Sequence, residues 1–204
     1  FHVQRKEYMS GCQSLSKENL HRSQMTGKYP WGGCRKAVKT ELLLKNKIRF
    51  SEHKVGEEAI YSFLLVHYAK SFSFIKGSVY EYVNRAGSQS DTKDDDPWGS
   101  VAAALKEKVM QMGLYERYAD TVNAFIATAA IVSLDRMAGK YTGAEYRRRA
   151  KERVRRYRSE VDNNFPVDVK NMDTKARLMY PFLKIGWIPP IHAASCMKRA
   201  MRNR

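Results

Sequence analysis

The stretch that decides the fold reads IRFSEHKVGEEAIYSFLLVHYAKSFSFIKGSVYEYVNRAGSQS and runs from Ile48 to Ser90. From Glu57 onward, apolar residues recur at intervals of three and four, which predicts a helix that ends near Lys70. The helix starts with two carboxylates, Glu57 and Glu58, and negative charge is favourable at the positive end of the helix dipole. The stretch therefore opens with a carboxylate pair in the first turn of a helix.

The second half of the stretch favours strands. Residues 72–74 and 79–82 are rich in aromatic and β-branched side chains, which suit a pleated sheet, and Lys76-Gly77 separates them as a turn. A basic loop that contains Gly87 follows. These strands lie near the middle of the chain, so the sequence predicts an α+β fold with more helix than strand.

The remaining chain is predicted to be helical, with polar turns between helices. Asp94-Asp95-Asp96-Pro97 offers two interpretations: a metal site, or a helix start with Asp96 as the N-cap and Pro97 in the first turn. We favour the helix start because three consecutive carboxylates cannot all converge on one ion from an extended chain. Periodicity and capping signals predict helices over residues 34–44, 57–70, 97–112, 114–137, 143–163, 174–183 and 191–202. A helix is also predicted over residues 17–25, within a polar stretch that has no sustained period.

Composition limits the classes of function. The 204 residues are 43% apolar, enough for a real core, and the net charge of +16 indicates an anionic partner without identifying it. Three widely spaced cysteines support neither a disulfide framework nor a zinc site. No stretch approaches the ~20 apolar residues that a membrane span needs. The chain begins at Phe1 in mid-pattern, so we expect a fragment of a longer protein.

The order of these signals resembles the acceptor-side half of the family-2 glycosyltransferases, inverting enzymes of the GT-A type that use nucleotide-diphospho-sugars. Trp31, Lys36 and Glu41-Leu42-Leu43 can also be placed on positions of that family. The matching segments are Phe50, Gly56-Glu57-Glu58, Phe72-Ser73-Phe74-Ile75, Tyr80-x-Tyr82 and Arg85-x-Gly87-Ser88-x-Ser90.

The resemblance implies a division of the chain and a set of roles. Residues 1–95 would be the acceptor-side part of a GT-A-like catalytic domain, and residues 96–204 a helical, basic C-terminal extension. Glu58 would act as the catalytic base on the acceptor hydroxyl, with Glu57 as its orienting partner or as a hydrogen-bond acceptor for the sugar; the alternative is that both carboxylates only stabilise the helix start. Trp31 would line the acceptor site, with a buried core position as the alternative; Arg85 and Ser88 would lie near the diphosphate or the acceptor, with a solvated loop as the alternative.

The resemblance also implies what lies outside this chain. The nucleotide-binding half should precede residue 1, and it would hold the divalent metal, Mn²⁺ or Mg²⁺, that neutralises the leaving diphosphate. No metal ligand is assigned within the chain. We therefore expect a transferase that moves a sugar to a cell-surface polysaccharide or a lipid-linked acceptor, and we expect this chain alone to be incomplete and inactive.

Two alternatives concern the basic charge. A basic helical module that binds nucleic acid would use the arginines between Arg147 and Arg158, but no aromatic residues interleave on that face, so we do not expect nucleic acid as a partner. The helices over 143–163 and 191–202 pair apolar seams with basic faces, which favours an anionic membrane surface. We predict a cytoplasmic location, with peripheral attachment to the inner face of the cell membrane as an open alternative.

Overall fold

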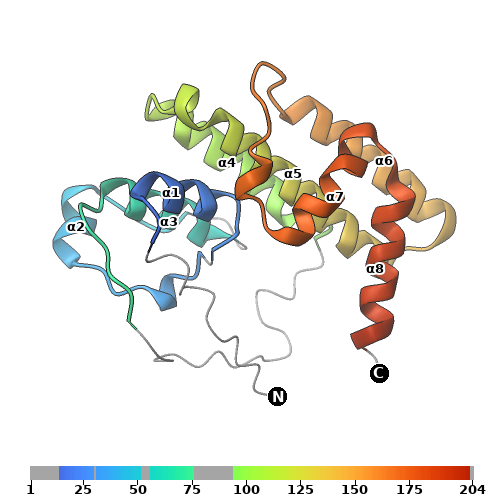
Figure 1. The fold of residues 1–204 in the computed structure, drawn as a ribbon, viewed down its shortest axis with the longest axis horizontal. Coiled ribbons are helices and arrows are strands. Elements are labelled where there is room, and N and C mark those ends of the chain that lie inside the picture. The colour runs from blue at the N-terminus through green and yellow to red at the C-terminus, as the bar shows by residue number, and fades with distance from the viewer. Residues whose placement is uncertain (1–13, 30, 52–55, 76–93, 203–204) are drawn as a thin grey trace.

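The computed structural model describes residues 14–29, 31–51, 56–75 and 94–202. Figure 1 shows helices joined by loops, with the first helices at one end of the molecule and the last ones at the other. The bounds of the α-helices are α1 Lys17–Met25, α2 Thr40–Lys45, α3 Glu57–Tyr68, α4 Pro97–Gln111, α5 Tyr115–Lys140, α6 Gly143–Glu160, α7 Thr174–Ile185 and α8 Ile188–Arg202. Two short 3₁₀ helices, η2 and η3, span Gly33–Arg35 and Val169–Asn171.

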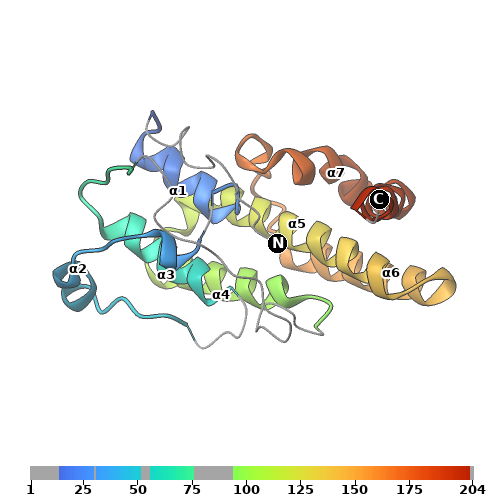
Figure 2. The same cartoon turned by 90° about the horizontal axis from the view of Figure 1, so that it is seen from below.

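Helix α5 is the centre of the fold. It packs against α1, α4, α6, α7 and α8, and Figure 2 shows its neighbours on several sides. Sixteen of its 26 residues are buried, which a helix allows only when other helices cover most of its circumference. The core is continuous: buried side chains of α3 and α5, such as Phe63 and Phe125, belong to one cluster with Leu183 of α7 and Ile191 of α8.

The α+β prediction is wrong for the described residues, which contain helices and no strand. Residues 71–75 have no regular structure, and Phe72 and Phe74 pack edge to face at 5.8 Å from each other. Aromatic and β-branched residues favour a strand only where a neighbouring strand pairs with them, and no described residue forms such a strand. The second predicted strand, 79–82, lies outside the described residues.

The helix predictions fared better than the strand predictions. Helix α3 begins at Glu57 as expected, after Gly56 in a left-handed conformation with φ of 77°. A Cβ at Gly56 would overlap the Trp98 ring and lie 2.9 Å from Val101 Cγ2, so only glycine fits this entry to the helix. The helix predicted over residues 34–44 is wrong in extent: it is a 3₁₀ turn followed by the short α2.

Within the described ranges, no helix has both the length and the apolar character that crossing a membrane requires. The proposed boundary near residue 95 falls between α3 and α4, and these two helices pack against each other. The division into two parts stays a prediction.

Candidate functional site

The candidate site is built around Glu58, in the first turn of α3. Its Oε1 accepts a hydrogen bond from the backbone N–H of Gly33 at 2.5 Å. No other hydrogen bond of its carboxylate to a described residue is present, so Oε2 remains available to another donor. One oxygen thus fixes the carboxylate, while the other has no hydrogen-bond partner among the described residues.

The segment from Trp31 to Lys36 faces this carboxylate and is itself firmly held. Lys36 Nζ donates to the carbonyl oxygens of Trp31 at 2.6 Å and Gly32 at 3.0 Å. Ser62 of α3 donates its hydroxyl to the same Trp31 oxygen at 2.6 Å. These bonds tie the segment to α3 and position the Gly33 N–H against Glu58.

Burial changes the acidity of Lys36. Loss of solvation lowers its pKa to about 8, although the nearby negative charge of Glu58 works in the opposite direction. Phe50 lies close by: a Cβ at Gly33 would be 3.1 Å from Phe50 Cζ and 3.3 Å from Glu58 Oε1. The site therefore combines a carboxylate, a partly desolvated ammonium and the exposed ring of Phe50, which stacks on Tyr61 at 4.1 Å.

The other predicted site residues differ in what the structure shows. The Trp31 ring packs against Trp98 and Phe125, at centroid distances of 5.0 and 5.1 Å, and its N–H donates to the carbonyl oxygen of Gln24. These are core contacts, and the predicted contact of Trp31 with a sugar stays a prediction. Glu57 adjoins Glu58 in the first turn of α3 and makes no side-chain ion pair with a described residue. Arg85 and Ser88 lie outside the described residues.

The link between Gly33 and Glu58 could not be deduced from the sequence. The two residues are 25 positions apart, and no periodicity relates a backbone N–H in a Gly-Gly turn to a particular carboxylate. The sequence offers one compositional signal here, because two consecutive glycines, Gly32 and Gly33, are typical of a turn.

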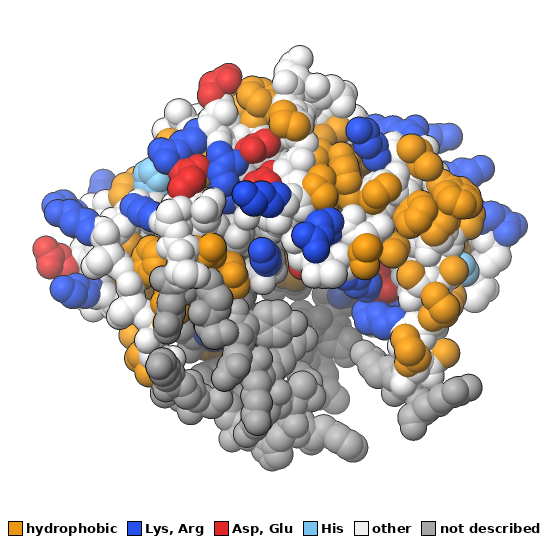
Figure 3. Space-filling view, in the orientation of Figure 1, with side chains coloured by type: hydrophobic (Ala, Val, Ile, Leu, Met, Phe, Trp, Pro, Cys, Tyr) orange, Lys and Arg blue, Asp and Glu red, His pale blue; other side chains and the backbone are white. Residues whose placement is uncertain are grey.

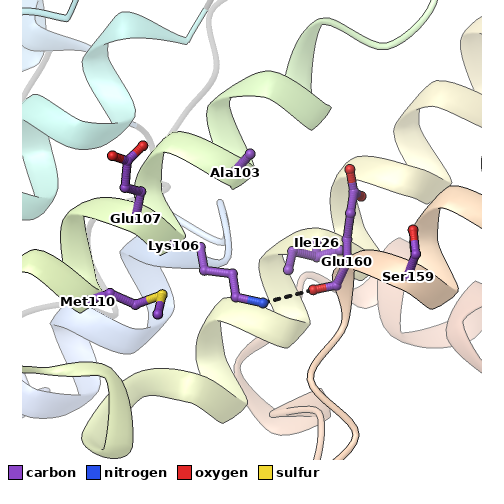
Figure 4. Close-up of a pocket in the computed structure, with 7 residues that line it drawn as sticks. All are labelled: Ala103, Lys106, Glu107, Met110, Ile126, Ser159 and Glu160. Atoms are coloured by element: carbon purple, nitrogen blue, oxygen red, sulfur yellow. Dashed lines mark hydrogen bonds between the residues drawn. The ribbon is translucent and has the colours of Figure 1, made fainter.

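A separate hollow of about 260 Å³ lies between α4, α5 and α6. Figure 4 shows Lys106 crossing it to donate to the carbonyl oxygen of Glu160 at 3.0 Å. None of the predicted site residues lines this hollow. Its lining residues are Ala103, Lys106, Glu107, Met110, Ile126, Ser159 and Glu160.

The helix start that the sequence predicted after the acidic run is confirmed, because α4 begins at Pro97. Asp95 contacts Lys140 and Arg149 at 2.7 and 3.0 Å, and Asp96 pairs with arginines of α6. Asp96 does precede the first residue of α4, but its side chain does not cap that helix. In the described part of the chain, no group of three or more His, Cys, Asp or Glu side chains is arranged to hold a metal ion.

Several arginines of the arginine-rich face of α6 form ion pairs within the protein. Arg153 is buried, with 3% of its surface exposed, and pairs with Asp96; Arg156 contacts Asp96 and Glu160. Arg148 and Arg149 both bond to Glu145. The support for a nucleic-acid-binding face is accordingly reduced to the outermost cations of this helix.

No protein-family model, curated protein or solved structure matches the chain.

Proposed function

We propose that this chain is the acceptor-side part of an inverting glycosyltransferase, in which Glu58 is the general base. The observation that carries the proposal is the asymmetric anchoring of Glu58: Oε1 is held by the Gly33 N–H, and Oε2 has no described partner. A general base must be fixed and must keep a lone pair for the proton it removes. This arrangement meets both requirements.

The reaction assigns a distinct task to each neighbour. Glu58 Oε2 takes the proton of an acceptor hydroxyl while the hydroxyl oxygen attacks the anomeric carbon of the donor, and the diphosphate leaves from the opposite face. Lys36 is a positioning residue, since its bonds to Trp31 and Gly32 hold the turn that fixes Glu58. Glu57 orients the acceptor, and a divalent metal, Mn²⁺ or Mg²⁺, would be held by residues outside this chain and would neutralise the leaving diphosphate.

The proposal depends on the contacts of Glu58 and does not depend on the β-strands that the sequence predicted. The acceptor is a cell-surface polysaccharide or a lipid-linked precursor, which places the reaction in the cytoplasm at the inner face of the cell membrane. Nucleic acid is not proposed as a partner, because the buried and paired arginines of α6 are engaged with Asp96, Glu145 and Glu160.

The test is sugar transfer by the protein together with its donor-binding half, measured with radiolabelled nucleotide-diphospho-sugars and lipid-linked acceptors. Glu58→Gln should lower kcat by about 10²–10⁴, the usual contribution of a general base. Folding should persist because the amide oxygen of Gln still accepts from Gly33 N–H. Glu57→Gln is the matched control, and its kcat should fall by less than about tenfold, below the range of a lost base. Near-normal turnover of Glu58→Gln, with a melting temperature like that of the wild type, would exclude the assigned base.

A further inference from the structure

The outer surfaces of α7 and α8 expose large apolar side chains side by side. Figure 3 shows apolar side chains gathered over these two helices. Leu178 and Ile185 are two turns apart on α7, and Met197 and Met201 are one turn apart on α8, so each pair lies along one helix face. The α7–α8 apolar face consists of Leu178, Ile185, Trp187, Met197 and Met201, which are 54–72% exposed.

The fold does not need these side chains. Both helices already bury an opposite face: Leu183 of α7 and Ile191 of α8 are 0% and 2% exposed and belong to the core around α5. The turn between the two helices is formed by Gly186, which adopts a left-handed conformation with φ of 77° and ends α7. The exposed apolar residues are thus additional to the core and available to a partner.

Positive charge lies beside the α7–α8 apolar face. Residues 174–204 contain seven Lys or Arg and no Asp or Glu. Lys175, Lys198 and Arg199 pair with Asp135 of α5, whereas Arg177 and Lys184 of α7 are exposed and form no ion pair with a described residue. Arg158 of α6 reaches the same edge, since a Cβ on Gly186 would lie 2.7 Å from its Nη2. The described cations of this region without an ion pair therefore lie along the α7 edge of the apolar face.

We propose that the α7–α8 apolar face binds the surface of an anionic lipid membrane, with its apolar side chains entering the headgroup region. Trp187 suits this environment because its ring is apolar and carries one polar N–H, and it packs edge to face on Phe182 at 5.6 Å. Lys and Arg near the apolar residues are attracted by the negative charge of the leaflet. The lipid is favoured over a protein partner because Arg177 and Lys184 are exposed beside the apolar side chains of α7, and residues 174–204 contain no carboxylate that would repel an anionic surface.

This inference deepens the proposed function by naming the face that meets the membrane. It rests on the part of the proposed function that places the protein at a membrane, and it does not require sugar transfer. The test is co-sedimentation of the chain with vesicles of phosphatidylglycerol and phosphatidylcholine, compared with vesicles of phosphatidylcholine alone. Binding should require the anionic lipid and should fall steeply as salt is raised from about 0.05 to 0.5 M, because salt screens the charges. Iodide quenching of Trp187 fluorescence should decrease when the vesicles bind.

Two pairs of variants separate the face from general charge and hydrophobicity. Leu178→Gln with Ile185→Gln should weaken binding at least about tenfold, whereas Leu44→Gln, at an equally exposed position on α2, should leave it unchanged. Arg177→Gln with Lys184→Gln should weaken binding about 25-fold, or about fivefold for each charge. Arg147→Gln with Lys151→Gln on α6 is the control of equal charge.

Three outcomes of these experiments would overturn the inference. Equal affinity for neutral vesicles excludes the anionic surface, and equal loss in the control variants excludes this face. A dimer in analytical ultracentrifugation that Leu178→Gln with Ile185→Gln dissociates, without vesicle binding by the wild type, identifies a second copy as the occupant. Glu58→Gln should bind vesicles like the wild type. Vesicle binding without sugar transfer therefore contradicts the enzymatic proposal alone, and transfer to a soluble acceptor without vesicle binding contradicts this one alone.

Discussion

Asp96 joins three helices through one carboxylate, and its loss should destabilise the protein more than that of any exposed charge. Its Oδ2 lies 3.0 Å from Arg153 Nε and 3.1 Å from Arg156 Nη1, and its Oδ1 accepts from Ser133 Oγ at 2.5 Å. The contact with Arg153 is an ion pair that lacks hydrogen-bond geometry at Nε. Arg153 is nevertheless nearly inaccessible to water, so its charge needs this partner.

The magnitude follows from what Asp96→Asn leaves behind. Removing one partner of a buried ion pair costs about 3–5 kcal/mol, because the remaining charge is desolvated and uncompensated. Arg153 keeps a second carboxylate, Glu160, at 3.4 Å, and the amide oxygen of Asn can still accept from Ser133. The lower end of the range applies, about 3 kcal/mol in the free energy of unfolding, or about 6–12 °C in Tm for a chain of this size.

The assay is urea denaturation at pH 7, followed by circular dichroism at 222 nm. The midpoint should fall while the m-value stays constant, because the surface exposed on unfolding does not change. Glu152→Gln is the matched control: this carboxylate is 74% exposed and lies 3.8 Å from Arg148, so the loss should stay under about 0.5 kcal/mol. In a double-mutant cycle with Arg153→Met, the coupling should exceed about 1 kcal/mol. A loss below about 1 kcal/mol for Asp96→Asn, or no coupling, would refute the reasoning.

Two further predictions concern pH. Burial lowers the pKa of His21 to about 4, so between about pH 6.5 and 4 the unfolded chain binds a proton that the folded chain does not. The free energy of unfolding should therefore fall as pH drops through this range. His21→Gln should remove this contribution to the pH dependence, which urea titrations across that range would measure. Burial raises the pKa of Asp135, but hydrogen bonds from Lys198 and Ser195 outweigh it and hold the value at about 2. Asp135→Asn should lose about 2 kcal/mol at pH 7, and acid titration should show the difference from wild type vanish between pH 4 and 2, with a constant difference contradicting the assignment.

The sequence predicted helices well where a local signal decided the matter. The start of α3 at Glu57 was placed correctly because periodicity and terminal charges act within one or two turns. The helix predicted over residues 17–25 is also confirmed, although its stretch has no sustained period. The helix predicted over residues 114–137 is too short, because α5 continues through Gly139 to Lys140. A Cβ at Gly139 would lie 2.8 Å from Arg199 Nη2, so the absence of a side chain here leaves room for Arg199 of α8. No local sequence pattern reveals this contact between α5 and α8.

The strands and much of the site could not be judged from local patterns. Strand propensity at Phe72 and Phe74 depends on a partner strand that the segment itself cannot supply. Arginines on α6 were grouped as one basic face, although Arg153 turns inward to Asp96, 57 residues earlier. For the site, the position of Glu58 in the first helical turn followed from the sequence, whereas its anchoring to Gly33 depends on a long-range contact.

The dense surroundings of α5 restrict how this protein can change. Its middle section is lined by small side chains that are at most 1% exposed, and several helices approach it closely there. Adding even one methylene group to a filled interior forces neighbours off their preferred rotamers, at about 1–3 kcal/mol. Because the neighbours lie on different sides, a larger residue cannot be accommodated by shifting a single helix. Substitutions should therefore accumulate on α2 and the outer face of α6, while the size of the residues along α5 stays nearly fixed. The small buried residues are Ala119, Ala124, Ala127, Ala129, Ala130 and Ser133.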